Sequence, residues 1–213
     1  MSILELHWLH TLLNQELKMK ILVIGATGTI GSAVVEALAK NHEVISASRS
    51  SEVAVDISDW NSIEKMYRSL PKLDAIVSTS GEAKFGPLEN LSHEDFAFGL
   101  INKLMGQVNL VRYGLEHINA SGSITLTSGI LALQPHAESV MLTMINSGVE
   151  GFVRSAALGL SQAKRLNAVS PPLVKETATK MGWGVGGTPA NVVAQEYVKA
   201  IESNMNGRVL QLI

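Results

Sequence analysis

A run of glycines directly after a short apolar stretch places the tightest constraint on the fold of this chain. Residues 21–24 are four consecutive large aliphatic residues, and Gly25, Gly28 and Gly31 follow with the spacing G-x-x-G-x-x-G. Such a short apolar run is typical of a strand buried on both faces of a parallel sheet. Residues 29–40 then carry apolar side chains at helical spacing. The pattern predicts a strand, a glycine turn and a helix.

This arrangement is suited to holding a phosphate. The first glycine allows a tight bend, the second lets the backbone approach a pyrophosphate, and the third lets the helix pack close to the strand. The helix N-terminus adds free N–H groups and the positive end of its dipole. We therefore predict a dinucleotide site. The residues that we expect to contact the coenzyme at this turn are Gly25, Thr27, Gly28, Thr29, Ile30 and Gly31.

The second predicted strand, at residues 42–48, indicates which coenzyme binds. It ends at Ser48, Arg49 and Ser50. An acidic residue at this point binds the ribose 2′-hydroxyl of NAD, whereas an arginine with small hydroxyls accommodates the 2′-phosphate of NADP. No carboxylate lies between residues 47 and 51, so the sequence favours NADP(H) over NAD(H). The alternative is that Arg49 is a solvated loop residue.

The rest of the chain alternates short apolar strands with helices. We expect further strands at 52–57, 74–80, 122–128, 164–169 and 208–212, and helices at 59–70, 92–117, 138–160 and 190–203. Such alternation requires right-handed crossovers. It predicts an α/β fold with a single Rossmann-type, doubly wound parallel sheet and helices on both faces. The strand ends at Asp56-Ile57 and Ser80-Gly81 supply further expected coenzyme contacts.

Composition excludes several classes of function. With 17 basic and 19 acidic residues the net charge is −2, so no nucleic-acid or anionic-membrane partner is indicated. The chain has no cysteine, which excludes disulfides, cysteine-ligated zinc and thiol catalysis. We expect a cytoplasmic protein without a bound metal. Residues 1–18 lack the features of a signal peptide, and we expect them to form a peripheral extension of one nucleotide-binding domain at 19–213.

The glycine turn, DAIVSTSG at 74–81, GSITLTS at 122–128 and RLNAVSPP at 165–172 together resemble the short-chain dehydrogenase/reductase family. The resemblance covers about residues 19–213 and is strongest to small bacterial members. It implies hydride transfer between a nicotinamide and a carbonyl or alcohol of a small-molecule substrate. It also implies a homodimer or homotetramer formed through the two long helices.

In the family scheme a serine positions the substrate oxygen, a tyrosine exchanges the proton, a lysine four residues later holds the ribose, and an asparagine on the preceding helix anchors a water. Ser128 matches the serine. Leu142 stands at the tyrosine position and Asn146 at the lysine position, while Lys103 falls at the asparagine position. The chain has thus exchanged lysine and asparagine. We predict Ser128, Lys103 and Asn146 as the catalytic residues.

The missing tyrosine leaves the proton donor open. General acid–base help is worth about 10² to 10⁴ in rate, and a leucine cannot supply it. Lys103 can serve if its pKa is lowered by desolvation or a neighbouring cation; water and His136 are alternatives. Trp183, which lies among glycines, either closes over a flat or apolar substrate or packs on the core edge.

Two functions compete at this point. The first is an NADP(H)-dependent, short-chain dehydrogenase/reductase-like oxidoreductase that acts on a small carbonyl or alcohol substrate with non-standard proton delivery. The second is a catalytically impaired NADP(H)-binding sensor or regulatory protein. A sugar-nucleotide epimerase is less favoured, because that chemistry also depends on the tyrosine.

Overall fold

The computed structural model describes residues 18–161, 163–184 and 186–212. These residues form a seven-stranded sheet in the order β3-β2-β1-β4-β5-β6-β7. All neighbouring strands are parallel. The strands are β1 (Lys20–Ile24), β2 (Glu43–Ser48), β3 (Val53–Ala54), β4 (Leu73–Ser78), β5 (Ile118–Thr127), β6 (Arg165–Ser170) and β7 (Val209–Gln211). The order reverses between β1 and β4, where open α/β sheets bind ligands beyond the carboxyl ends of the strands.

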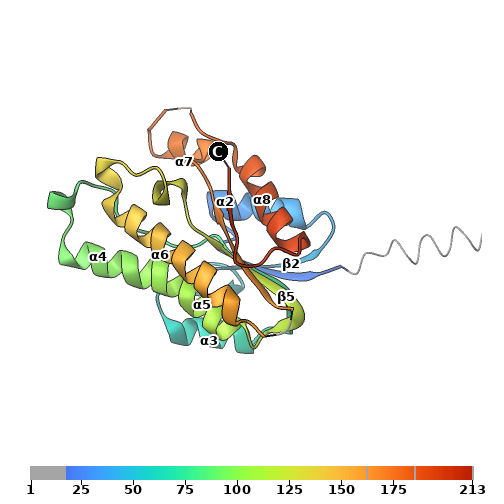
Figure 1. Cartoon of the computed structure of the whole chain (residues 1–213). Coiled ribbons are helices and arrows are strands. Elements are labelled where there is room, and N and C mark those ends of the chain that lie inside the picture. Colours follow the sequence, from blue (N-terminus) through green and yellow to red (C-terminus); the bar gives the residue numbers. More distant parts are fainter. Residues whose placement is uncertain (1–17, 162, 185, 213) are drawn as a thin grey trace, which may run out of the picture.

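Helices cover both faces of the sheet, as Figure 1 shows. One face is covered by α2 (Thr29–Leu38) and α8 (Ala190–Glu202). The other face is covered by α3 (Trp60–Arg68), α5 (Gly106–Gly114) and α6 (Val140–Ala156). The predicted Rossmann-type fold is therefore confirmed.

Strand β1 is apolar without interruption because it faces two cores. Ile21 and Val23 pack into the core under α2 and α8. Leu22 and Ile24 pack into the core on the opposite face. All four side chains are fully buried, as expected when successive side chains of a strand point to opposite faces and helices cover both.

The predicted helix at 92–117 is present but contains a π-helical insertion. Ser92 and Asp95 form the expected capping box at the start of α4 (His93–Gly99). A π-helix, η2 (Leu100–Met105), then joins α4 to α5. Short π segments inside α-helices often occur at functional sites, and this one carries Lys103.

Three other expectations need correction. The strand expected at 52–57 shortens to β3, because the Asp56 carboxylate accepts hydrogen bonds from the N–H and hydroxyl of Ser58 and so turns the chain. A helix that was not expected from the sequence, α7 (Lys175–Lys180), follows β6. The helix expected at 138–160 is α6 flanked by the 3-10 turns Ala137–Ser139 and Ala157–Gly159.

Two sequence expectations concern the N-terminal segment and membrane-spanning helices. The extension predicted at 1–18 lies outside the described residues, apart from Lys18. None of the helices in the described part of the chain combines the length and apolar character needed to span a bilayer.

The contact between the end of β1 and the start of α2 tolerates no side chain. Gly25 has a φ of 83°, a backbone conformation that favours glycine. A Cβ on Gly31 would lie 2.0 Å from the Gly25 carbonyl oxygen. The third glycine of the turn is therefore required for packing of helix against strand.

Replacing Gly31 with alanine is expected to destabilise the protein by about 1–3 kcal/mol, since overpacking at a backbone contact forces the helix to move. Gly159→Ala is the matched control, because nothing lies within 4 Å of a Cβ at that position. Denaturant unfolding of both variants tests this. Equal stability of the two variants would contradict the packing role of Gly31.

Candidate functional site

Two adjoining cavities lie at the carboxyl edge of the sheet. The smaller cavity has a volume of about 320 Å³ and the larger cavity about 1080 Å³. Both are lined by Thr79, Ser80 and Gly81, which follow β4. The two cavities therefore share a wall.

The smaller cavity gathers most of the predicted coenzyme contacts. Those lining it are Gly25, Thr27, Gly28, Ser48, Arg49, Ser50, Asp56, Ile57, Ser80 and Gly81. Ile30 instead lines the larger cavity. Thr29 and Gly31 line neither cavity. Gly31 acts in packing, because its Cα faces the Gly25 carbonyl.

Sequence reasoning missed several residues of the smaller cavity. Thr79 donates its hydroxyl to the carbonyls of Ile24 and Gly25, at 3.0 and 3.2 Å, and so fixes the end of β1. The Asn102 side chain accepts a hydrogen bond from the Glu82 N–H at 2.7 Å. Asn102 comes from the π segment and directly precedes Lys103, so a shift of one residue in the family alignment would have indicated it.

The Arg49 guanidinium is not free in this cavity. It forms an ion pair with Glu82, with 2.9 Å between Nη2 and Oε1. The sequence interpretation considered carboxylates only near residue 49 in the chain, and Glu82 arrives from the loop after β4. Arg49 also helps to hold the pKa of the Asp56 carboxyl below its usual value, although the hydrogen bonds from Ser58 are the larger cause.

The larger cavity brings together the three predicted catalytic residues. Lys103, Ser128 and Asn146 all line it, and so does Leu142. They come from the π segment, the end of β5 and helix α6. The exchange of lysine and asparagine inferred from the sequence thus places both side chains around one space.

Lys103 is in an environment that favours its neutral form. Its side chain packs against Gly81, where a Cβ would lie 2.7 Å from the lysine Cγ. No described carboxylate forms an ion pair with Lys103. Burial lowers the pKa of the Lys103 ammonium from 10.5 to about 8. A pKa of about 8 is close enough to neutral pH to suit a general acid or base.

Asn146 has an unused hydrogen-bond acceptor. Its side chain is 2% exposed, and its Oδ1 has no hydrogen-bond partner. Its Nδ2 makes only a long contact of 3.4 Å with the Gly129 carbonyl. A buried polar atom without a hydrogen-bond partner lowers the stability of the fold. The Asn146 side chain therefore suits a ligand whose hydroxyl donates a hydrogen bond to Oδ1.

The Ser128 hydroxyl is hydrogen-bonded to helix α6. Its hydroxyl donates to Oε1 of the buried Glu150 at 2.8 Å, and Ser128 is 2% exposed. Glu150 is held in turn by Arg154 at 2.7 Å. The hydroxyl is therefore committed to helix α6 in this structure. The hydroxyl oxygen can still accept a hydrogen bond, and its role in positioning a substrate oxygen stays a prediction.

None of the chain's three tyrosines offers a phenol to the larger cavity. Tyr67 donates to the Leu110 carbonyl at 2.9 Å. The Tyr197 hydroxyl lies 2.6 Å from the Thr127 hydroxyl. Burial raises the pKa of both phenols well above the usual value. Tyr113 stacks on Trp60. Tyrosine is therefore not among the residues that line the larger cavity.

Aromatic side chains also line the larger cavity. Phe85 contacts His136 and Trp183, with ring centroids 5.2 and 5.4 Å apart. The Phe85 loop is fastened by a hydrogen bond from the Gly86 N–H to the Glu138 carbonyl. Trp183 follows α7 and is 49% exposed. The sequence indicated Trp183 and His136 as candidates but did not indicate Phe85.

Comparison with known proteins gives relatives in one family. A family model described as enoyl-(acyl carrier protein) reductase matches residues 17–205. Hydroxynaphthalene reductase arp2 of Aspergillus fumigatus is 32% identical over 114 residues, which are 53% of this chain and 42% of that protein. Trihydroxynaphthalene reductase of Colletotrichum orbiculare is 28% identical over 67% of this chain and 51% of that protein. The chain spans about half the length of these curated relatives.

Solved structures agree over more of the chain. The protein lin1944 from Listeria innocua has a TM-score of 0.88 at 42% identity, covering 92% of this chain and 100% of that chain. A small-chain dehydrogenase in complex with NADPH has a TM-score of 0.83 at 26% identity, covering 92% of this chain and 96% of that chain. Because the family model spans most of the sequence and the sheet agrees with it, this chain belongs to the short-chain dehydrogenase/reductase family.

Proposed function

We propose that this protein is an NADP(H)-dependent oxidoreductase that interconverts a small carbonyl compound and an alcohol, with Lys103 as the proton donor and acceptor. One observation carries the proposal. A cavity lined by the glycine turn and Arg49 opens beside a cavity that contains a lysine with a pKa of about 8. The curated relatives are reductases by name.

The residues present suit the coenzyme. The turn at Gly25 and Gly28 would take the pyrophosphate, and Ser48 with Arg49 would take the 2′-phosphate. The unpartnered Oδ1 of Asn146 would accept a hydrogen bond from a ribose hydroxyl. When bound, the coenzyme supplies or accepts the hydride, and the protein's task is positioning. A related small-chain dehydrogenase was solved in complex with NADPH, which supports this choice.

Lys103 would supply the proton that the family takes from tyrosine. In carbonyl reduction the ammonium of Lys103 donates a proton to the substrate oxygen, and in alcohol oxidation the neutral amine accepts it. Leu142, which the sequence comparison puts at the tyrosine position, would add only apolar surface to the same cavity. Desolvation of Lys103 is what brings its pKa to the range where both directions are accessible.

The substrate would carry a flat, apolar ring. Phe85, Trp183 and His136 line the larger cavity together with aliphatic residues from the loop after β6. Aromatic faces of this kind favour stacking partners. The names of the two curated relatives specify hydroxynaphthalenes, which are flat rings bearing hydroxyl groups.

In this scheme Ser128 would hold neighbouring elements of the site in place. Its bond to Glu150 fixes the end of β5 against α6, so we assign it a positioning role. The whole scheme fits a cytoplasmic protein, since a chain without cysteine suits a reducing compartment.

An NADP(H)-binding sensor is the alternative, and the absence of a phenol from the larger cavity favours it. A sensor would bind NADPH without oxidising it. An enzyme would consume NADPH with at least one carbonyl from a panel of flat aromatic and small aliphatic ketones.

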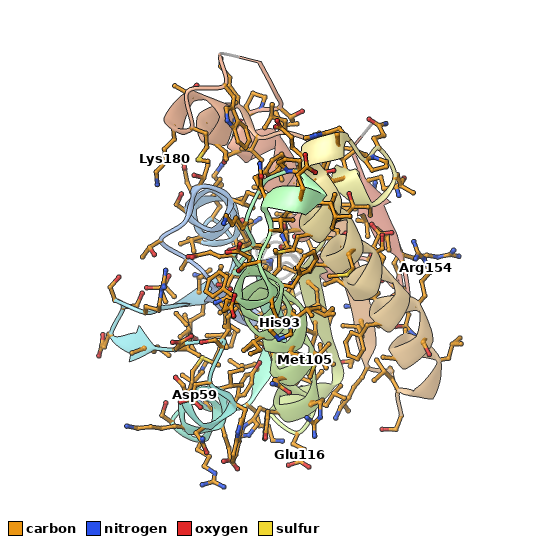
Figure 2. All side chains as sticks on the ribbon, turned by 90° about the vertical axis from the view of Figure 1, so that its left-hand side faces the viewer. Asp59, His93, Met105, Glu116, Arg154 and Lys180 are labelled. Carbon is orange, nitrogen blue, oxygen red and sulfur yellow. The ribbon has the colours of Figure 1, made fainter. Side chains whose placement is uncertain are left out.

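We further propose that the protein forms a homodimer through its long helices. Phe98, Ile101 and Met105 on the α4–α5 helix and Met144 on α6 are each about half exposed. Figure 2 labels Met105 on the long helix. A set of exposed apolar side chains on two adjacent helices is typical of an interaction surface, and a second copy of the chain offers the matching face.

Lys103→Met is expected to lower kcat/KM for NADPH-dependent reduction about 100-fold, the usual contribution of a general acid.

In the unsubstituted protein the reduction rate should fall as the pH rises through about 8, because the Lys103 ammonium is then lost. Oxidation of the alcohol should rise over the same range. Steady-state pH profiles in both directions measure this, and Lys65→Met, at an exposed residue on α3, is the control.

Stability provides a second readout for the same variant. The folded pKa of Lys103 lies below its ordinary value of 10.5, so the partly buried ammonium destabilises the fold below about pH 8. That penalty disappears as the pH rises towards 10.5. Lys103→Met should therefore be more stable than the parent at pH 7, with a smaller gain at pH 10. A gain independent of pH, together with unchanged reduction, would contradict the proposed role.

Phe98→Glu is expected to convert the dimer to a monomer, because a carboxylate would be buried without a partner at the interface. Val192→Glu, at an exposed residue of α8 on the opposite face, should leave the dimer intact. Light scattering coupled to size-exclusion chromatography reports the mass of each. A monomeric parent protein would rule out the proposed dimer.

A further inference from the structure

The ion pair between Arg49 and Glu82 occupies a particular place in the sheet. Arg49 directly follows β2, and Glu82 lies on the loop after β4. Strands β2 and β4 are not neighbours, because β1 lies between them. Two strand spacings amount to roughly 10 Å. The two side chains therefore reach towards each other across the carboxyl end of β1, where the glycine turn begins.

Both members of the pair line the smaller cavity. The Glu82 backbone is fixed, because its N–H donates to Asn102 at 2.7 Å. The side chains of Arg49 and Glu82 are 71% and 60% exposed. An exposed pair of this kind contributes little stability and can open readily. The pair is thus an exposed part of the cavity lining and can be broken by a ligand.

While the Arg49–Glu82 ion pair is intact, the charges of the smaller cavity disfavour a coenzyme 2′-phosphate in addition to the pyrophosphate. Asp56 and Glu82 contribute two carboxylates, against the single guanidinium of Arg49. Asp56 is engaged by Ser58 through two hydrogen bonds and stays in place. Glu82 is the carboxylate that competes directly for the arginine, because it contacts the guanidinium at 2.9 Å.

We propose that Glu82 is a specificity-determining residue that competes with the coenzyme 2′-phosphate for Arg49. A ligand with a 2′-phosphate must take the guanidinium from Glu82 and tolerate the released carboxylate nearby. A ligand with a 2′-hydroxyl has no such requirement. Glu82 therefore weakens NADPH binding selectively and narrows the preference for NADPH over NADH. The inference rests on the proposed coenzyme site and concerns how that site discriminates.

Glu82→Gln tests this, because glutamine keeps the shape of the side chain and removes its charge. Isothermal titration calorimetry with NADPH and with NADH gives both affinities without requiring turnover. We expect Glu82→Gln to lower the Kd for NADPH about fivefold. This matches the energy of an exposed ion pair together with the relief of charge repulsion. The Kd for NADH should change less than twofold. Glu89→Gln, at an exposed residue that lines neither cavity, is the matched control.

Repeating the substitution in the Arg49→Gln variant distinguishes an effect of the ion pair from a general effect of removing a negative charge. In Arg49→Gln the substitution Glu82→Gln should no longer tighten NADPH, because the two residues act through each other. If Glu82→Gln bound NADPH with unchanged or weaker affinity and NADH with unchanged affinity, the proposed competition would be overturned, but the proposed coenzyme site would not. Equal tightening of both coenzymes would also overturn the competition. If neither the parent nor Glu82→Gln bound any coenzyme, the proposed function would fail as well.

Discussion

The contact between the Gly25 carbonyl and Gly31 is the constraint on which the rest of the structure depends. It brings α2 against the end of β1 so closely that no Cβ fits. The Thr79 hydroxyl caps the same carbonyl and thereby sets where the loop after β4 begins. That loop carries Gly81, against which Lys103 packs. The smaller and larger cavities are thus built on one backbone contact.

The sequence predicted the fold well because the fold is encoded locally. Residues 21–24 are apolar at every position because both faces of β1 are covered, and the glycine spacing reports a backbone contact. The third strand was overestimated, since the Asp56–Ser58 turn that ends it depends on side-chain hydrogen bonds. The π segment had no signal in the sequence, because a helical register shift leaves the apolar pattern nearly unchanged.

The candidate site was less predictable, because its contacts join residues far apart in the chain. Arg49 was found from its distance after the glycines, but its partner Glu82 is 33 residues away. Ser128 was placed correctly at the end of β5, yet the direction of its hydroxyl is set by Glu150 on α6. Lys103 was inferred from resemblance to a family, and its low pKa follows only from burial that the fold creates.

A calorimetric titration of the purified protein with NADPH and NADH tests most directly whether a coenzyme binds at the glycine turn. We predict saturable binding of NADPH with one site per chain, and weaker binding of NADH. Absence of measurable heat and of any fluorescence change with both coenzymes would contradict the central claim.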